Sequence, residues 1–123
     1  MDMSKHLRKW LNDQVLREQF GDEFEDEIAD VTEQSIRNRF TTTRQLEPVI
    51  TFVTGWKLIP NVSQRQALCE FWGPETDEWI GRRLQVYRFR KERRDDATGA
   101  VRTTWEKRVR LPLSEVRKLE RAI

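Results

Sequence analysis

The sequence has little of what covalent or metal-based chemistry requires. Its 123 residues include one cysteine, Cys69, and one histidine, His6. A single cysteine excludes an internal disulfide. One cysteine and one histidine also cannot supply the set of spaced ligands that a zinc site needs. The same scarcity leaves a serine or cysteine nucleophile without its usual base, and no phosphate-cradling glycine loop occurs. We therefore expect a protein that is not an enzyme and that has no cofactor and no bound metal.

Long apolar runs are also missing. No stretch approaches the roughly 18 apolar residues that cross a membrane, and the N-terminus has no apolar core of a secretory signal. Apolar residues make up 37% of the chain and charged residues 36%, yet five Trp and six Phe provide large anchors for a small core. The sequence predicts a soluble cytoplasmic protein of one folded domain, with no membrane among its partners.

The charge is divided along the chain, although the formal net charge is only +2. Residues 13–33 hold nine acidic residues against one basic residue, a net charge of −8. Residues 82–110 hold eleven basic residues against four acidic ones, a net charge of +7. Such a division predicts one acidic and one basic surface, each suited to a partner of opposite charge.

The stretch from Trp56 to Tyr87 predicts a strand, a helix, a tight corner and a second strand. The helix spans residues 62–72, because Ala67, Leu68 and Phe71 share one helical stripe and Gly73-Pro74 ends it. In the corner that follows, we expect Trp79 and Ile80 to plug the core, and Gly81 to allow either a positive φ or a close approach of the chain.

The flanking residues complete a mainly β fold with helices. We expect a first helix of about fifteen residues capped by Ser4, a long strand over 23–36 that is bulged or continuous, and a strand over 46–53. A hairpin joins strands over 82–91 and 101–111, and Ser114 caps a last helix. The order predicts an OB-like five-stranded barrel with a helix between strands 3 and 4, plus N- and C-terminal helices. The parts are an N-terminal helical extension (1–21), the OB-like barrel (22–112) and a C-terminal helix (113–123).

The central stretch resembles a poorly characterised group of small phage and prophage proteins of predicted OB-like fold. The resemblance covers roughly residues 45–111, and its most specific part is a G-x-x-T-D-x-W-I-G-[KR] motif, represented here by Gly73, Thr76, Asp77, Trp79, Ile80, Gly81 and Arg82. Pro60 before Asn61 and both terminal helices depart from the group's pattern. The resemblance implies a phage or mobile-element origin, and its fold suggests binding of single-stranded DNA.

Our first functional hypothesis is a non-catalytic module that binds single-stranded DNA or RNA. Such modules combine cations that follow the phosphates with aromatic rings on which bases stack. The basic hairpin offers both kinds of residue. The candidate site residues are Arg82, Tyr87, Arg88, Phe89, Arg90, Lys91, Arg93, Arg94, Trp105, Arg108 and Arg110.

The second hypothesis is a protein-interaction module, an adaptor or an inhibitor of a host nuclease. A row of carboxylates imitates a phosphate backbone and can occupy a basic cleft. The candidates in segment 22–33 are Glu23, Glu25, Asp26, Glu27 and Asp30. Two alternatives stay open: this acidic face offsets the basic hairpin within the fold, or the two surfaces pair between copies in a homo-oligomer.

Overall fold

The protein is mainly β with helices, as the sequence predicts. The computed structural model describes residues 9–37 and 43–121. In chain order its elements are α1 (Asp13–Gln19), β1 (Glu23–Arg37), β2 (Arg44–Phe52), β3 (Lys57–Leu58), α2 (Val62–Trp72), the short 3₁₀ helix η2 (Thr76–Trp79), β4 (Arg83–Arg94), β5 (Val101–Arg110) and α3 (Leu113–Arg121).

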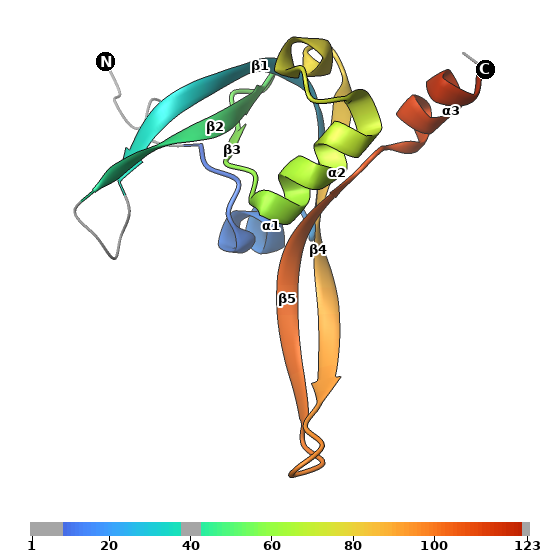
Figure 1. The fold of residues 1–123 in the computed structure, drawn as a ribbon. Coiled ribbons are helices and arrows are strands. Elements are labelled where there is room, and N and C mark those ends of the chain that lie inside the picture. The colour runs from blue at the N-terminus through green and yellow to red at the C-terminus, as the bar shows by residue number, and fades with distance from the viewer. Residues whose placement is uncertain (1–8, 38–42, 122–123) are drawn as a thin grey trace.

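The five strands form one open antiparallel sheet in the order β3-β2-β1-β4-β5. Strand β1 joins the two halves of the sheet, because its residues 23–27 pair with β4 and its residues from Ile28 onward pair with β2. The register shifts between Ile28 and Asp30, so of the two alternatives that the sequence left open, the strand is bulged rather than continuous. As a result, the β1–β2 ribbon and the β4–β5 hairpin extend from the body in different directions (Figure 1).

Side chains connect the two edges of this sheet. Within the described residues β3 and β5 do not pair. Instead, Gln64 of α2 donates its Nε2 to the carbonyl of Lys107 in β5 at 2.7 Å, and Lys107 donates its Nζ to the carbonyl of Leu11 at 2.9 Å. Burial lowers the pKa of the Lys107 ammonium. These contacts hold α2 and the N-terminal segment against β5.

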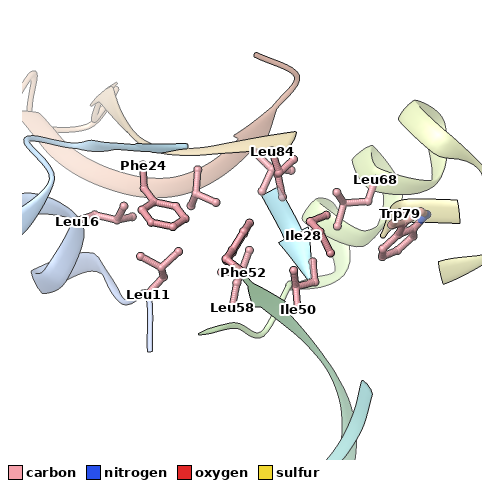
Figure 2. Packing of buried hydrophobic residues seen from close by; sticks show 12 residues of the cluster. Leu11, Leu16, Phe24, Ile28, Ile50, Phe52, Leu58, Leu68, Trp79 and Leu84 are labelled. Carbon is pink, nitrogen blue, oxygen red and sulfur yellow. The ribbon is translucent and has the colours of Figure 1, made fainter. Parts of the chain in front are cut away.

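The core is small and mainly aliphatic, and Phe24, Phe52 and Trp79 are its buried aromatic residues. It is centred on Phe24, Ile28, Phe52, Leu68 and Leu84, which are at most 5% exposed (Figure 2). The rings of Phe24 and Phe52 meet edge to face, with centroids 5.0 Å apart, an arrangement that aromatic pairs favour. One sheet face and helices α1 and α2 thus share a single apolar cluster.

The first helix is shorter than the sequence predicts. It begins at Asp13, and the Asn12 side chain caps it by accepting from the Val15 amide at 2.9 Å, whereas Ser4 lies outside the described residues. Residues just before the helix bond to the sheet instead. The Lys57 amide donates to the Lys9 carbonyl at 2.7 Å, and the Leu11 amide donates to the Lys57 carbonyl at 2.8 Å. Backbone pairing with a distant residue overrides the local helical pattern here.

The corner motif is only half buried. Trp79 is 4% exposed and donates its Nε1 to the Gly73 carbonyl at 2.9 Å, and Gly81 has the expected positive φ of 85°. Ile80, however, is 44% exposed, so the prediction that both residues plug the core is wrong for Ile80.

In the described part of the chain, no helix is long and apolar enough to cross a membrane.

Candidate functional site

The β4–β5 hairpin carries different residues on its two faces. Leu84 and Val86 point into the core, and strand alternation therefore turns Tyr87 and Phe89 to the opposite face. Across the ladder, Tyr87 lies opposite Arg108 and Phe89 lies opposite Glu106. Phe89 is 38% exposed and Tyr87 is half-buried, so both rings reach the surface.

Arginine and aromatic side chains stack on each other along this outer face. The guanidinium of Arg110 lies 4.1 Å from the centre of the Tyr87 ring, and that of Arg108 lies 3.8 Å from the centre of the Phe89 ring. We call these four residues the arginine–aromatic face. A guanidinium that stacks through its plane keeps the N–H groups at its edge, where they can bind anions.

Exposed carboxylates contact the same arginines. Arg110 is 3.1 Å from Glu23, and Arg108 is 3.1 Å from Glu106, which also lies 3.7 Å from Lys91. The hydrogen bond from Arg108, followed by the charge of Lys91, lowers the pKa of Glu106. Pairs between partners this exposed contribute little, because water and salt screen them. A phosphate can therefore replace these carboxylates at low cost.

Further cations continue toward the tip of the hairpin. Arg90 pairs with Glu92 at 3.0 Å, whereas no ion pair within residues 9–37 and 43–121 involves Arg93, Arg94 or Arg102. Arg93 and Arg102 lie directly opposite each other in the ladder, and all three side chains are exposed. Like charges in register destabilise a sheet unless an anion lies nearby.

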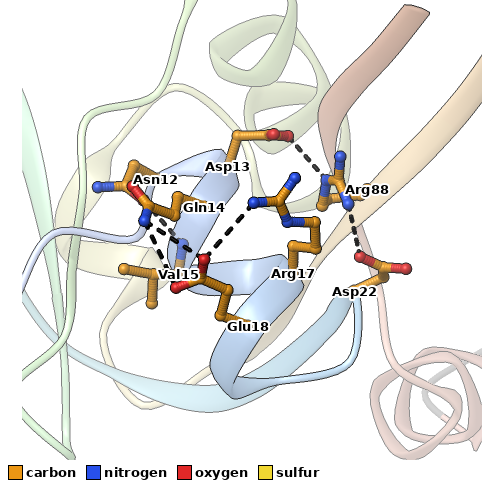
Figure 3. Close-up of polar contacts among 8 residues, drawn as sticks. All are labelled: Asn12, Asp13, Gln14, Val15, Arg17, Glu18, Asp22 and Arg88. Atoms are coloured by element: carbon orange, nitrogen blue, oxygen red, sulfur yellow. Dashed lines mark hydrogen bonds and ion pairs between the residues drawn. The ribbon is translucent and has the colours of Figure 1, made fainter.

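Arg88 has a different role from the one the sequence suggested. Its side chain is only 5% exposed, and it donates to Asp13 and to Asp22, each at 2.8 Å (Figure 3). It also lies over the ring of Trp105 at 4.2 Å. The hydrogen bond to Asp22 is the main cause of the raised pKa of Arg88. Arg88 thus fastens α1 to the hairpin through its Nε and Nη1 atoms.

The structure therefore divides the predicted site. It places Tyr87, Phe89, Arg108 and Arg110 together, with Lys91, Arg93 and Arg94 further along the hairpin. Trp105 lies on the other face with Arg88 and Arg90. Arg82, just before β4, lies 3.9 Å from the buried Glu115 of α3, away from the arginine–aromatic face.

The acidic segment lies beside the basic hairpin in the same sheet. Glu23 and Glu25 pair in register with Tyr87 and Gln85, and Glu25 forms an ion pair of 3.0 Å with Arg83. The backbone pairing of β1 with β4 thus brings the −8 and +7 segments together. Part of the acidic charge offsets the basic hairpin within the fold, and the other carboxylates, Glu27 and Asp30, stay exposed.

Asp26 does not belong to an exposed acidic row. It is 8% exposed and faces inward, where it accepts from the Thr54 amide at 3.0 Å, the Thr54 hydroxyl at 2.7 Å and the Glu27 amide at 2.7 Å. Burial alone would raise the pKa of Asp26, but these hydrogen bonds and the charge of Arg83 outweigh it, and the pKa is lowered. Strand alternation explains the correction, because it turns every second residue of β1 to the core.

We expect Thr54→Val to destabilise the fold through Asp26. Loss of the hydroxyl should lower the free energy of unfolding by about 1–3 kcal/mol at neutral pH, because a buried carboxylate loses a donor. A lowered carboxyl pKa stabilises the fold above the unfolded-state pKa, and this contribution is lost as the pH falls through the folded-state value. Urea denaturation of both proteins between pH 7 and pH 3 should show the difference shrinking in acid. An undiminished difference in acid would contradict the role of the carboxylate.

A pocket of about 530 Å³ opens next to Arg108, between α2 and the outer edge of β5. It is lined by Asn61, Ser63, Gln64, Ala67, Glu106, Lys107, Arg108 and Val109. The sequence analysis did not include the α2 residues of this pocket. They lie on the polar side of the helix, which is expected to face water unless β5 is known to pack against it.

No group of three possible metal ligands occurs in the part of the chain that the structure describes.

Comparisons of the chain with protein-family models, with curated proteins and with solved structures find no match.

Proposed function

We propose that this protein is a non-catalytic module that binds single-stranded nucleic acid through the arginine–aromatic face of β4 and β5. The observation that carries the proposal is the stacking of Arg108 on Phe89 and of Arg110 on Tyr87 on a surface exposed to solvent. Cations that follow phosphates and rings that accept bases are the two components of sequence-tolerant strand binding.

The spacing of this face suits an extended strand. Tyr87 and Phe89 are two residues apart on β4, so their side chains repeat about every 7 Å along one line. Arg108 and Arg110 repeat in the same way on the adjacent strand β5. Bases would stack on or between the rings, while the edges of the guanidinium groups contact the phosphates. Lys91, Arg93 and Arg94 would extend the contact toward the hairpin tip.

An OB-like fold is part of the proposal. The strand order β3-β2-β1-β4-β5 with α2 between β3 and β4 is compatible with it, and the Gln64 and Lys107 contacts stand where a barrel would close. OB-fold proteins use the loop between strands 4 and 5 among their binding elements, which here corresponds to the hairpin tip. We also propose a relationship to the phage and prophage group, which rests on the corner motif around Trp79.

The proposal predicts that two arginines of the same hairpin differ in their effect on binding. Arg108→Ala should remove about one unit from the slope of log affinity against log salt, because one phosphate contact is lost. Arg88→Ala should leave the slope unchanged but lower the midpoint of urea denaturation, since this buried guanidinium already binds Asp13 and Asp22.

Fluorescence anisotropy of a labelled single-stranded oligonucleotide of about 20 nucleotides, at several salt concentrations, measures both slopes. DNA and RNA of the same sequence distinguish the two targets. Circular dichroism verifies that each variant is folded. Absence of binding at low salt, where the electrostatic attraction is strongest, would refute the proposed function.

A further inference from the structure

The outer edge of β5 presents unpaired backbone groups. β5 is the last strand in the sheet, and its outer edge has no partner strand in the described ranges. The Lys107 carbonyl points outward, because Gln64 of α2 binds it at 2.7 Å. Inward and outward groups alternate along an antiparallel strand, so the N–H and C=O groups of Val101, Thr103 and Trp105 also point away from β4. An edge of this kind is a template for another strand.

Apolar side chains flank the centre of this edge. Val101 is 57% exposed and Trp105 is 44% exposed, and both lie on the same face of β5, two positions on either side of Thr103. The pattern is symmetric about Thr103. If a second strand of the same sequence ran antiparallel to this edge, its Trp105 would lie opposite Val101 and its Val101 opposite Trp105. Pairs of an aromatic and a β-branched residue across two strands stabilise sheets.

We propose that a second copy of this chain pairs with the first along β5, antiparallel and about a two-fold axis at Thr103. In this register Thr103 lies opposite Thr103 of the second copy, and Val101 lies opposite Trp105 of the second copy on both sides of the axis. Every outward N–H and C=O of these three residues then has a partner, and the ladder ends before the Lys107 carbonyl that Gln64 occupies.

The pocket beside β5 accommodates the end of the second hairpin. The register places turn residues 97–100 of the second copy alongside Glu106–Val109, which line the pocket together with the first turns of α2. In this register Thr98 of the second copy lies opposite Arg108, so the turn that carries Asp96 lies beside Arg108 and the positive end of the α2 dipole. Asp96 is exposed and has no ion pair within the described chain, so the charges are complementary.

Arg102, on the opposite face of β5 from Val101, also gains a partner. In the proposed register Arg102 of the second copy lies opposite Thr104 and diagonal to Glu106, within reach of a long side chain. The carboxylate of Glu106 is 43% exposed and therefore accessible. The two arginine–aromatic faces end on the same side of one continuous sheet. Dimerisation does not depend on the proposed function, and its test contains no nucleic acid.

Disulfide trapping tests the register. In a Cys69→Ser background, Thr103→Cys places two thiols opposite each other across the axis, where neighbouring Cα atoms are about 5.5 Å apart and within the range of a disulfide. Thr104→Cys is the matched control, because its side chain points to the other face and lies opposite Arg102 of the second copy. With diamide as oxidant, we expect a covalent dimer of the full chain from Thr103→Cys and monomer from Thr104→Cys on a non-reducing gel.

Analytical ultracentrifugation tests the association without cysteines. We expect the unmodified protein to dimerise with increasing concentration, and Val101→Asp to raise the dissociation constant by at least about tenfold, because the pair with Trp105 of the second copy is lost and a carboxylate then faces its ring. Val101 is exposed, and circular dichroism verifies that the variant folds. A protein that is monomeric at every concentration, or equal trapping of both cysteine variants, would overturn the proposal.

Discussion

The double substitution Tyr87→Ala, Phe89→Ala should weaken binding of a single-stranded oligonucleotide by about 2–4 kcal/mol, or roughly 30-fold to 700-fold at 25 °C. Each ring removed costs the stacking of one base. The rings also support the guanidinium groups of Arg110 and Arg108, which lie 4.1 Å and 3.8 Å from them. The double variant therefore loses the stacking of bases, whereas both arginines remain to contact phosphates.

The salt dependence separates these two contributions. The arginines remain in the double variant, so the slope of log affinity against log salt should stay close to that of the unmodified protein while affinity falls at every salt concentration. Leu46→Ala is a matched control, because Leu46 is 70% exposed on β2, away from this face. Anisotropy titrations of all three proteins make the comparison. Equal affinities would exclude Tyr87 and Phe89 from the contact surface.

Trp79→Ala should lower the free energy of unfolding by about 3–5 kcal/mol, the usual cost of removing a large buried aromatic residue. Trp79 is 4% exposed, and its Nε1 donates to the carbonyl of Gly73 just after α2. The substitution leaves a cavity under the corner and removes that hydrogen bond. Because β4 begins directly after this corner, the loss should reach the base of the hairpin.

The neighbouring residue provides the control. Ile80→Ala should cost less than about 1 kcal/mol, since the side chain is 44% exposed and little apolar area is buried. Urea denaturation followed by tryptophan fluorescence or circular dichroism measures both values. A cost for Ile80→Ala equal to that for Trp79→Ala would mean that the corner packs differently from the arrangement described.

Local signals in the sequence determined most of the elements. Helix α2 follows from the stripe of Ala67, Leu68 and Phe71, and it ends before Gly73 as expected. The long strand β1 was also predicted, whereas the sequence left open whether it is bulged. These features depend on residues a few positions apart, whose spacing, turn chemistry and capping can be recognised without a fold.

Sequence reasoning failed where a distant partner decides the local structure. The helical pattern does not hold over residues 9–12, because Lys9 and Leu11 bond to the backbone of Lys57. Asp26 was expected to be exposed and is buried, whereas Ile80 was expected to be buried and is exposed. The alternation of β1 and the turn of the corner determine which side chain faces the core. A buried hydrogen bond to a residue far away in sequence outweighs local preference, and no local pattern reveals it.

The candidate site shows the same division. The sequence by itself determined which residues the hairpin contains, but it left open whether Tyr87 and Phe89 are exposed. Only the tertiary structure decided that Arg88 is enclosed by Asp13 and Asp22 while Arg108 and Arg110 lie on exposed rings. The physical reason is that a charge can be assigned to binding or to support only when its neighbours are known, and those neighbours come from α1, β1 and the opposite strand.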